Sequence, residues 1–312
     1  MRLLKIVPDD INISFMPFRK VFLTLSAIAV AVSLVMVFVK GMNFGIDFQG
    51  GILVEVRMPQ AADLGQMRSQ LGALGLGEVN LQEFGTPTDV LIRVAAQEGD
   101  ASAQQAAVAA VKNALGTNVD YRRVEFVGPK VSSELLLDGI LAVSAAIIAM
   151  LIYIWLRFEW QFGLGAVAAL THDVFLTLGI FSLLGLEFNL STVAAVLTIA
   201  GYSINDTVVV FDRIREDLRK FKTKPVPELL NGSINATLSR TVMTSVTTLV
   251  ALGALFFLGG EVIRDFSFAM IFGVLVGTYS SICVAAPLLL YTNVAARARS
   301  GADESTEAAE TP

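Results

Sequence analysis

The chain has 312 residues, of which 54% are apolar and 16% are charged, with a formal net charge of −5 and a mean hydropathy of +0.65. An ordinary soluble domain carries about a quarter charged residues, so this composition excludes a soluble enzyme. It also excludes a disordered chain, except at the acidic C-terminal end. The acidic balance argues against a nucleic-acid partner. A single cysteine, Cys283, and a single histidine, His172, exclude an internal disulfide and a His-rich metal cluster. We therefore expect an integral membrane protein without cofactors.

Six apolar runs are long enough to cross a bilayer as helices, which takes roughly 20 residues. The first, 21–39, is too long for a signal-peptide core and is followed by no small-residue cleavage site, so it is predicted to be an uncleaved anchor. The other five predicted helices fall within 137–291, at 137–156, 162–184, 190–211, 241–258 and 266–291.

Lys and Arg residues near the ends of these runs predict the orientation of the chain, because positive residues close to a span stay in the cytoplasm. With the N-terminus inside, all the basic flanks lie on one side, whereas the opposite short turns contain only Arg264. We therefore expect a protein of the bacterial inner membrane with both termini cytoplasmic. The basic flanks are Arg2 to Lys20, Arg157, Arg213 to Lys224, and Arg297 with Arg299; the predicted regions are a cytoplasmic start at 1–20, an exported insert at 40–136 and a cytoplasmic, acidic, disordered tail at 292–312.

The exported insert has the pattern of a βαββαβ unit, the ferredoxin-like arrangement. It contains no His, no Cys and no clustered carboxylate pair, which favours a binding or lever element over a catalyst. A small domain that merely folds is the alternative. The predicted strands are 51–58, 78–84, 89–95 and 120–127, with a turn at 85–88; the predicted helices are 61–74 and 102–115.

Few ionisable residues lie inside the predicted spans, where each costs a few kcal/mol and usually lines a pathway. Asp173 lies beside His172 in the third span, Asp206 lies beside Asn205 in the fourth, and Arg240 opens the fifth. A carboxylate that moves between a guanidinium and hydrocarbon changes its affinity for a proton. The alternatives are a static buried ion pair between Asp206 and Arg240, and a histidine or aspartate at 172–173 that only bonds a neighbouring backbone group.

Hydroxyl groups follow Arg240 along one side of the fifth span, including Thr244 and Thr248. Such a ladder, meaning a row of hydroxyl groups along one side of a helix, can form hydrogen bonds to neighbouring helices or hold water molecules. Gly273 and Gly277 form a small-xxx-small pattern that brings helices close, and we expect a partner subunit to cover that face. Pro287 is expected to kink or loosen the last span.

Four motifs resemble the SecD/SecF family of bacterial Sec-dependent export. Residues 45–51, with Gly45, Asp47, Gly50 and Gly51, resemble its glycine-rich signature. Residues 201–216 are similar to the fourth span of its SecF members, 239–245 to the start of the fifth, and 170–173 to the third. The resemblance covers about residues 15–292 and places the chain in the resistance-nodulation-division superfamily.

The resemblance implies a subunit of the SecD–SecF complex, which uses the proton-motive force to promote preprotein translocation through, or release from, the SecYEG channel. It assigns proton conduction to Asp206 and Arg240, with Asp173 as a further candidate and with Asn205, Thr244, Thr248 and His172 as supporting polar groups. SecD would supply a matching carboxylate. The implied partners are SecD, SecYEG, translocating preproteins and membrane lipid, with YajC as a further candidate.

No nucleotide-binding P-loop is found in the sequence, so the chain is expected not to be an enzyme. Two other functions stay open at this point. One is a half-size, proton-coupled exporter of small molecules or lipids from the same superfamily. The other is a non-transporting membrane receptor.

Overall fold

The computed structural model of the chain describes residues 8, 11–97, 99, 101–260 and 263–292. Most of the predicted acidic tail, with Arg297 and Arg299, and the basic residues Arg2 and Lys5 lie outside the described residues. The chain divides into two compact units. We call them the helical unit (described residues up to Met42, Ser144–Leu186 and from Ser191 on) and the sheet unit (Asn43–Val143 and Glu187–Leu190).

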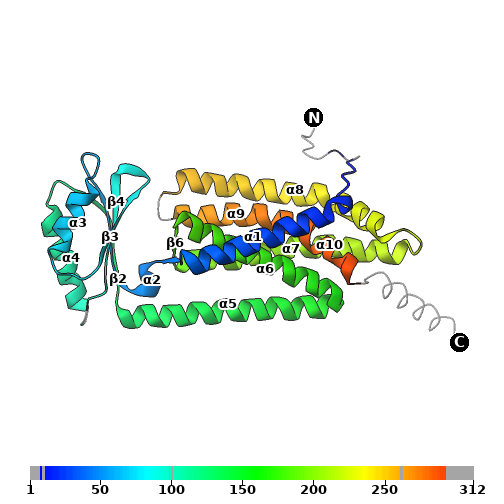
Figure 1. Cartoon of the computed structure of the whole chain (residues 1–312), viewed down its shortest axis with the longest axis horizontal. Helices are drawn as coiled ribbons and strands as arrows, with labels where there is room; N and C mark the ends of the chain where they lie inside the picture. Colours follow the sequence, from blue (N-terminus) through cyan, green and yellow to red (C-terminus); the bar gives the residue numbers. More distant parts are fainter. Residues whose placement is uncertain (1–7, 9–10, 98, 100, 261–262, 293–312) are drawn as a thin grey trace. The chain divides into compact units, whose positions relative to one another are not determined.

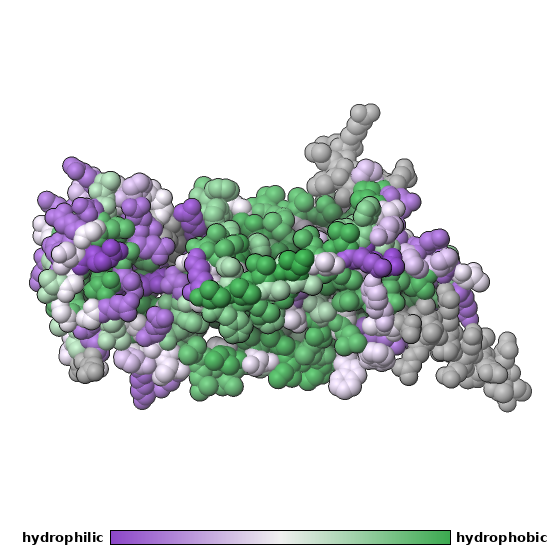
Figure 2. All heavy atoms as spheres, in the orientation of Figure 1, coloured by the Kyte–Doolittle hydropathy of each residue, from purple (hydrophilic) through white to green (hydrophobic). Residues whose placement is uncertain are grey.

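Within the described residues, six helical segments are long and apolar enough to cross a membrane, which confirms the six predicted spans. They run alongside one another in the ribbon view (Figure 1), and apolar side chains cover the helical unit on the face shown in Figure 2. The segments are α1 (Arg19–Val39) after η1 (Met16–Phe18), α5 (Pro129–Arg157), α6 (Trp160–Leu184), α7 (Leu190–Lys220), α8 (Val226–Leu258), and α9 (Arg264–Ser280) continued by η3 (Ser281–Ala285), α10 (Ala286–Leu288) and η4 (Leu289–Tyr291).

Two helices extend well beyond the apolar runs that predicted them. α7 continues to Lys220, and α8 already begins at Val226. Arg240, which is predicted to open the fifth span, therefore lies inside α8, and where the span begins within that helix stays a prediction. Hydropathy marks the part of a helix that suits hydrocarbon, whereas the helix itself continues through polar residues that can reach water.

The buried centre of the helical unit is formed by α6, α7 and the last span. Phe162 and Phe211 contact each other with ring centroids 5.2 Å apart, and both are almost fully buried. In contrast, none of the most apolar window of α5 is buried inside the chain. α5 therefore presents its side chains to lipid or to another subunit.

Glycines allow two pairs of helices, α9 with α7 and α6 with α1, to approach closely. Gly273 of α9 packs against Ile199 of α7, and Gly277 packs against Ser203, so an added Cβ at either position would press on α7. The expectation that a partner subunit covers this small-residue face was wrong, because the chain's own fourth span fills it. Gly179 of α6 packs in the same way against Ser33 of α1.

The last span changes its helical geometry next to Pro287. A π-helical turn, η3, follows α9 and ends at Ala285, two residues before the proline. Proline has no N–H to donate to the preceding turn, and single π-turns inside α-helices are frequent at functional sites. The turn begins at Ser281, whose hydroxyl takes part in the polar network described below.

The sheet unit contains a four-stranded sheet in the order β3-β4-β2-β5, with every neighbouring pair antiparallel. α3 and α4 lie on one face of it (Figure 1). β4 starts at Thr86, so the turn predicted at 85–88 is confined to Gly85. The elements in chain order are β2 (Gly51–Arg57), α3 (Leu64–Gly72), β3 (Val79–Phe84), β4 (Thr86–Val94), α4 (Ala101–Leu115) and β5 (Asp120–Val127).

Alternating residues of β2 explain why the strand is buried on both sides. Ile52, Val54 and Val56 pack against α3 and α4 in one apolar cluster. Leu53 points to the other face, where it packs with Ile46 of the short helix α2 (Ile46–Gln49). Side chains in a strand alternate between the two faces of the sheet, so both faces of β2 are covered.

A second, two-stranded sheet joins segments that are far apart in the sequence. β1 (Asn43–Phe44) pairs in parallel with β6 (Glu187–Phe188). The rings of Phe44, Phe48 and Phe188 contact one another, with centroids about 6 Å apart. The segment that follows the first span is thereby fastened to the turn between the third and fourth spans.

Candidate functional site

Asp206 lies in the middle of α7 and is 7% exposed. Its Oδ1 atom accepts a hydrogen bond of 2.7 Å from the hydroxyl of Thr241 in α8. Among the described residues, its Oδ2 atom has no hydrogen-bond partner. A buried carboxylate with one free oxygen has a position at which it can accept a proton or a further donor.

Arg240 precedes Thr241 on α8 and is exposed in this chain. Within the part of the chain that the structure describes, no hydrogen bond or ion pair joins its side chain to that of Asp206. The geometry is therefore not that of a static buried ion pair.

His172 and Asp173 form a second buried polar centre, on α6. The His172 Nδ1 atom lies 2.8 Å from Asp173 Oδ1, so the two adjacent side chains face each other. Asp173 Oδ2 accepts hydrogen bonds from Ser203 of α7, at 2.5 Å, and from Ser280 of α9, at 2.7 Å. Asp173 is fully buried, and the alternative in which the pair only bonds nearby backbone was wrong.

Serine and threonine hydroxyls lie between these two carboxylates. Ser203 is three residues before Asp206 on α7, and Thr207 directly follows it. The Thr207 hydroxyl is 2.8 Å from that of Ser281 at the start of the π-turn, and Ser281 also donates to the carbonyl oxygen of Ser203 at 3.5 Å. Hydroxyls of α7 and the last span thus bridge the neighbourhoods of Asp173 and Asp206.

These serines were not singled out from the sequence. Hydroxyl side chains are common in membrane helices and often bond only to their own helix, so single occurrences carry little signal. The adjacent pair Ser280 and Ser281 in the middle of an apolar span is the one pattern that could have indicated them. The partners of the pair come from α6 and α7, which no local pattern reveals.

The threonine ladder of α8 serves two different purposes. Thr244 and Thr248 donate to carbonyl oxygens of their own helix, so, within the described residues, these two hydroxyls do not serve the first of the two expected uses, bonding across helices. Thr241 reaches Asp206 instead, and Ser245 lies 2.7 Å from Thr278 of α9. Spacing alone does not say which turn of a helix meets a neighbour.

Asn205 does not join the buried groups, although it is adjacent to Asp206. It is exposed, because neighbouring residues of a helix point in directions about 100° apart. Arg240 and Thr244 are exposed as well. The helical unit therefore presents polar side chains on α7 and α8 within its predicted spans.

The glycine-rich signature forms a helical turn closed by two glycines. Gly45 precedes α2, Gly50 ends it with φ of +72°, and Gly51 starts β2 with φ of +117°. Both φ values belong to the region that favours glycine. A Cβ on Gly51 would also press on the carbonyl oxygen of Val94, so the backbone of β2 needs a glycine here.

Asp47 of the same signature binds the start of α7. Its Oδ2 atom accepts a 2.9 Å hydrogen bond from the backbone N–H of Leu190, the first residue of that helix. The first N–H groups of a helix lack internal partners and favour a negative charge. Asp47 thereby acts as an N-cap that comes from a distant part of the sequence.

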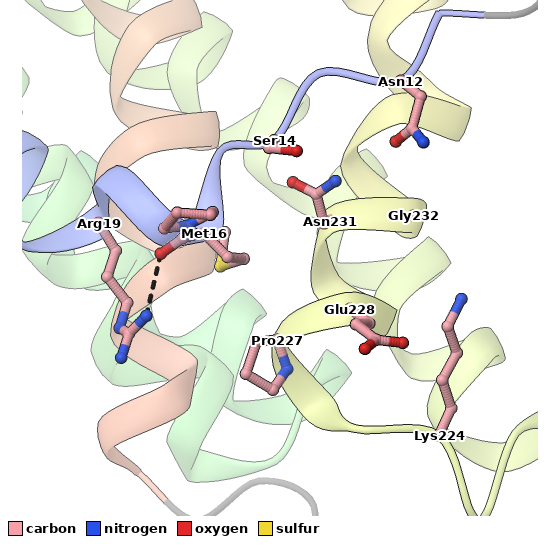
Figure 3. A pocket seen from close by; sticks show the side chains of 10 residues that line it. Asn12, Ser14, Met16, Arg19, Lys224, Pro227, Glu228, Asn231 and Gly232 are labelled. Carbon is pink, nitrogen blue, oxygen red and sulfur yellow. Dashed lines mark hydrogen bonds between the residues drawn. The ribbon is translucent and has the colours of Figure 1, made fainter.

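A hollow of about 510 Å³ lies between the N-terminal segment and the start of α8 (Figure 3). The segment above it is held by two asparagines. Asn231 accepts from the backbone N–H of Phe15, and Asn235 accepts from that of Ile13. Arg19 donates to the carbonyl oxygen of Met16 at its rim. The hollow shares no lining residue with the carboxylates, so it lies outside their site.

Among the described residues, no group of three or more His, Cys, Asp or Glu side chains is placed to hold a metal ion. The buried titratable side chains in the described part of the helical unit include three carboxylates, Asp173, Asp206 and Asp217, and one histidine, His172. Together with the neighbouring hydroxyls, these are groups that can accept or donate protons.

Six apolar helices around buried carboxylates define a multi-pass membrane protein with ionisable groups in its core. Residues 107–295 match the profile of the family described as protein export membrane protein SecD/SecF, C-terminal. Residues 35–62 match the SecD/SecF GG motif. The chain belongs to the SecD/SecF family.

Curated relatives and solved structures agree with this assignment. The protein translocase subunit SecF of Rickettsia rickettsii is 49% identical over 290 residues, covering 92% of this chain and 94% of the relative. That of Rickettsia bellii is 50% identical over 288 residues, covering 92% and 95%. The crystal structure of SecDF from Thermus thermophilus, a translocon-associated membrane protein, matches with a TM-score of 0.83 and 37% identity over 92% of this chain. This chain spans 39% of that SecDF chain.

Proposed function

We propose that this chain is the SecF subunit of a SecD–SecF complex that uses the proton-motive force to promote preprotein translocation through, or release from, the SecYEG channel. The curated relatives that cover almost the whole chain carry the name of a protein translocase subunit. They disfavour both a small-molecule exporter and a non-transporting receptor. The observation that carries the proton-driven part is buried Asp206, whose Oδ2 atom has no hydrogen-bond partner among the described residues and whose Oδ1 atom is bound by Thr241, the residue directly after Arg240.

Proton transfer on Asp206 would be coupled to the position of Arg240. A guanidinium stays protonated and favours the charged carboxylate when it is near, whereas burial favours the neutral form when it is distant. One elementary charge that crosses the membrane potential releases about 2.3 kcal/mol per 100 mV. That free energy suffices to bias an element with two states a few kcal/mol apart. Asp173 with His172 is the further proton-carrying candidate.

A second bundle from SecD would complete the site. Exposed Asn205 and Thr244 lie within predicted spans, where a polar side chain that faces lipid is costly, and exposed Arg240 directly precedes the fifth of these spans. A partner with its own carboxylate would cover them. The matching part of the Thermus SecDF chain leaves room for such a half, because this chain spans 39% of it. SecYEG, YajC and the preprotein are the further partners of this proposal.

The sheet unit would be the moving part on the exported side. Its strand order and its all-antiparallel pairing support a ferredoxin-like βαββαβ domain, and the six helices support the arrangement of resistance-nodulation-division proteins. We infer an exported domain at about 40–136, a cytoplasmic start at 1–20, and helices at 21–39 and 137–291 before a cytoplasmic tail at 292–312. The chain would lie in the inner membrane with both termini in the cytoplasm and would hydrolyse no nucleotide.

The decisive test is preprotein export with and without an uncoupler, in Asp206→Asn and Arg240→Met variants. Each variant should lose the gradient-dependent part of export and keep the part driven by ATP hydrolysis in the motor. Asp138→Asn is the matched control, because it makes the same chemical change at an exposed residue of α5, and it should export normally. Full gradient-dependent export by a well-assembled Asp206→Asn, Arg240→Met double variant would refute the proposed proton route.

A further inference from the structure

A hollow lined only by ionisable side chains lies where α5 ends and α7 leaves the predicted span. Its volume is about 500 Å³. Four of its lining residues are basic and two are acidic. They are Arg157, Asp212, Arg215, Glu216, Arg219 and Lys220.

Both acidic residues of this hollow already have a basic partner. Arg157 binds Asp212 at 2.7 Å, and Arg213, which does not line the hollow, binds Glu216 at 3.1 Å. The positive charges of Arg215, Arg219 and Lys220 are therefore not balanced by the acids of the hollow. The site is positively charged and suited to an anion.

Arg215 of α7 directs its guanidinium group toward the end of α5 at this hollow. Its Nη1 atom donates to the carbonyl oxygen of Arg157 at 3.4 Å. Its Nε atom is buried and, within the described residues, has no hydrogen-bond partner. A buried guanidinium N–H without an acceptor costs free energy unless a ligand binds it, and the planar guanidinium matches the geometry of a phosphate group.

The neighbouring residues place this hollow at the level of lipid headgroups. α5 ends at Arg157 and α6 begins at Trp160, so two spans meet the membrane surface here. Trp155 and Trp160 are exposed, at 76% and 51%, and exposed tryptophan is typical of the interface between membrane and water. An apolar stripe on α5, formed by the exposed side chains of Ile148, Ile152 and Leu156 about one turn apart, begins next to Arg157.

We propose that this hollow binds the phosphate group of an anionic phospholipid, whose acyl chains lie along the stripe of Ile148, Ile152 and Leu156. Basic pockets between membrane helices are known to hold anionic headgroups. A free phosphate would use the same cations but would leave the apolar stripe without a role, so the adjoining stripe favours a lipid. The proposal does not depend on protein export or on the protonation of Asp206.

The test measures lipid bound to the full chain, purified with any subunit that accompanies it, in nanodiscs of phosphatidylglycerol mixed with phosphatidylcholine. Bound lipid is identified by native mass spectrometry. The Arg215→Gln, Arg219→Gln double variant should lose its preference for phosphatidylglycerol by roughly thirtyfold, since two of the basic contacts are removed. The matched control, Lys222→Gln with Lys224→Gln, removes two charges from the same connection outside the hollow and should keep the preference.

An Arg215→Lys, Arg219→Lys double variant separates charge from folding, because it keeps both positive charges. It should retain most of the preference, and the Gln variant should be compared at equal amounts of assembled protein. Equal lipid preference in the Gln variant and its control would overturn the proposal. So would displacement of the lipid by inorganic phosphate alone, which would indicate a free-anion site, or loss of an accompanying subunit with the lipid retained, which would indicate a protein contact.

Discussion

The carboxylate of Asp47 accepts a hydrogen bond from the backbone N–H of Leu190, which lies 143 residues later in the chain. Asp47 belongs to the glycine-rich signature that follows the first span, and Leu190 is the first residue of the helix that carries Asp206. Leu190 belongs to the same compact unit as Asp47, whereas α7 from Ser191 on belongs to the helical unit. The hydrogen bond therefore fixes the first residue of α7 within the sheet unit.

Replacing Asp47 should loosen the first turn of α7. Loss of an N-cap acceptor typically costs about 1 kcal/mol, so Asp47→Ala is expected to raise amide exchange at 190–193 by roughly fivefold. Asp47→Asn keeps an oxygen acceptor and should change exchange far less. Hydrogen exchange read by mass spectrometry on the full chain measures both variants, and equal exchange in Ala and wild type would contradict the capping role.

The ion pair between Arg93 of β4 and Glu187 of β6, at 2.7 Å, is a second contact that holds β6 in the sheet unit. Arg93 also donates to the side chain of Asn43 in β1 at 2.6 Å. Both charged side chains are largely buried, so Arg93→Glu places two negative charges together and should disrupt the β1–β6 pairing. The Arg93→Glu, Glu187→Arg double variant should recover a substantial part of the lost thermal stability.

Thermal unfolding of the two single variants and the double variant measures this coupling as a double-mutant cycle. Additive losses, with no recovery in the double variant, would show that the two side chains do not stabilise each other. Arg123→Gln is a suitable control, since it removes a cation whose partner, Glu125, lies on its own strand and is half-exposed. Its effect should stay within about 0.5 kcal/mol.

Gly51→Ala should destabilise the four-stranded sheet. The residue has φ of +117°, and its Cβ would press on the carbonyl oxygen of Val94 in the neighbouring strand. Strain of this kind costs more than about 1 kcal/mol. Gly72→Ala, at the end of α3 with nothing within 4 Å of an added Cβ, is the matched control and should be neutral or stabilising. The two Tm values, measured on the purified full chain, decide the prediction.

The sequence predicted the periodic parts of this molecule better than its contacts. Six spans follow from apolar length, and the strands of the sheet unit follow from their own short patterns, because each of these depends on neighbouring residues. The partners of Asp173 do not, since Ser203 and Ser280 come from two other helices. Gly273 was assigned to a partner surface for the same reason, as only the folded chain shows Ile199 against it.

The stability of the sheet unit should fall in acid through Asp89. Two hydrogen bonds from Arg57, at 2.6 and 2.8 Å, and one from Thr86 hold the pKa of this carboxyl below its usual value. A lowered folded pKa contributes stability that is complete above the unfolded pKa, near 3.9, and is lost as the pH falls through the lower folded value.

Hydrogen exchange of β2 and β4, compared between pH 6 and pH values below about 4, measures this dependence. Asp89→Asn should be less stable at neutral pH and should lose less of its remaining stability in acid than the wild type does. Asp63→Asn makes the same change at an exposed cap and should leave the acid sensitivity of the sheet unchanged. Equal acid sensitivity in Asp89→Asn and wild type would show that another carboxyl governs it.

Asp173 should be essential for a stable helical unit. Its two oxygens serve Ser203, Ser280 and His172 in a site without solvent access. Ser280 can donate to the carbonyl oxygen of Gly277 instead, so Asp173→Ala leaves Ser203 and His172 as buried polar groups without this partner. Each unsatisfied group costs about 1 to 3 kcal/mol, which predicts a large drop in folded protein. Asp173→Asn keeps the side-chain volume and one acceptor oxygen. Its NH₂ group replaces the second carboxylate oxygen and faces a hydroxyl or the imidazole, so an intermediate loss of folded protein is expected.

The amount of folded protein in the membrane and its Tm in detergent are the readouts. Asn205→Ala, at an exposed position of α7, serves as the control and should match the wild type. If Asp173→Ala accumulates and unfolds like this control, the hydrogen bonds around Asp173 contribute little to stability.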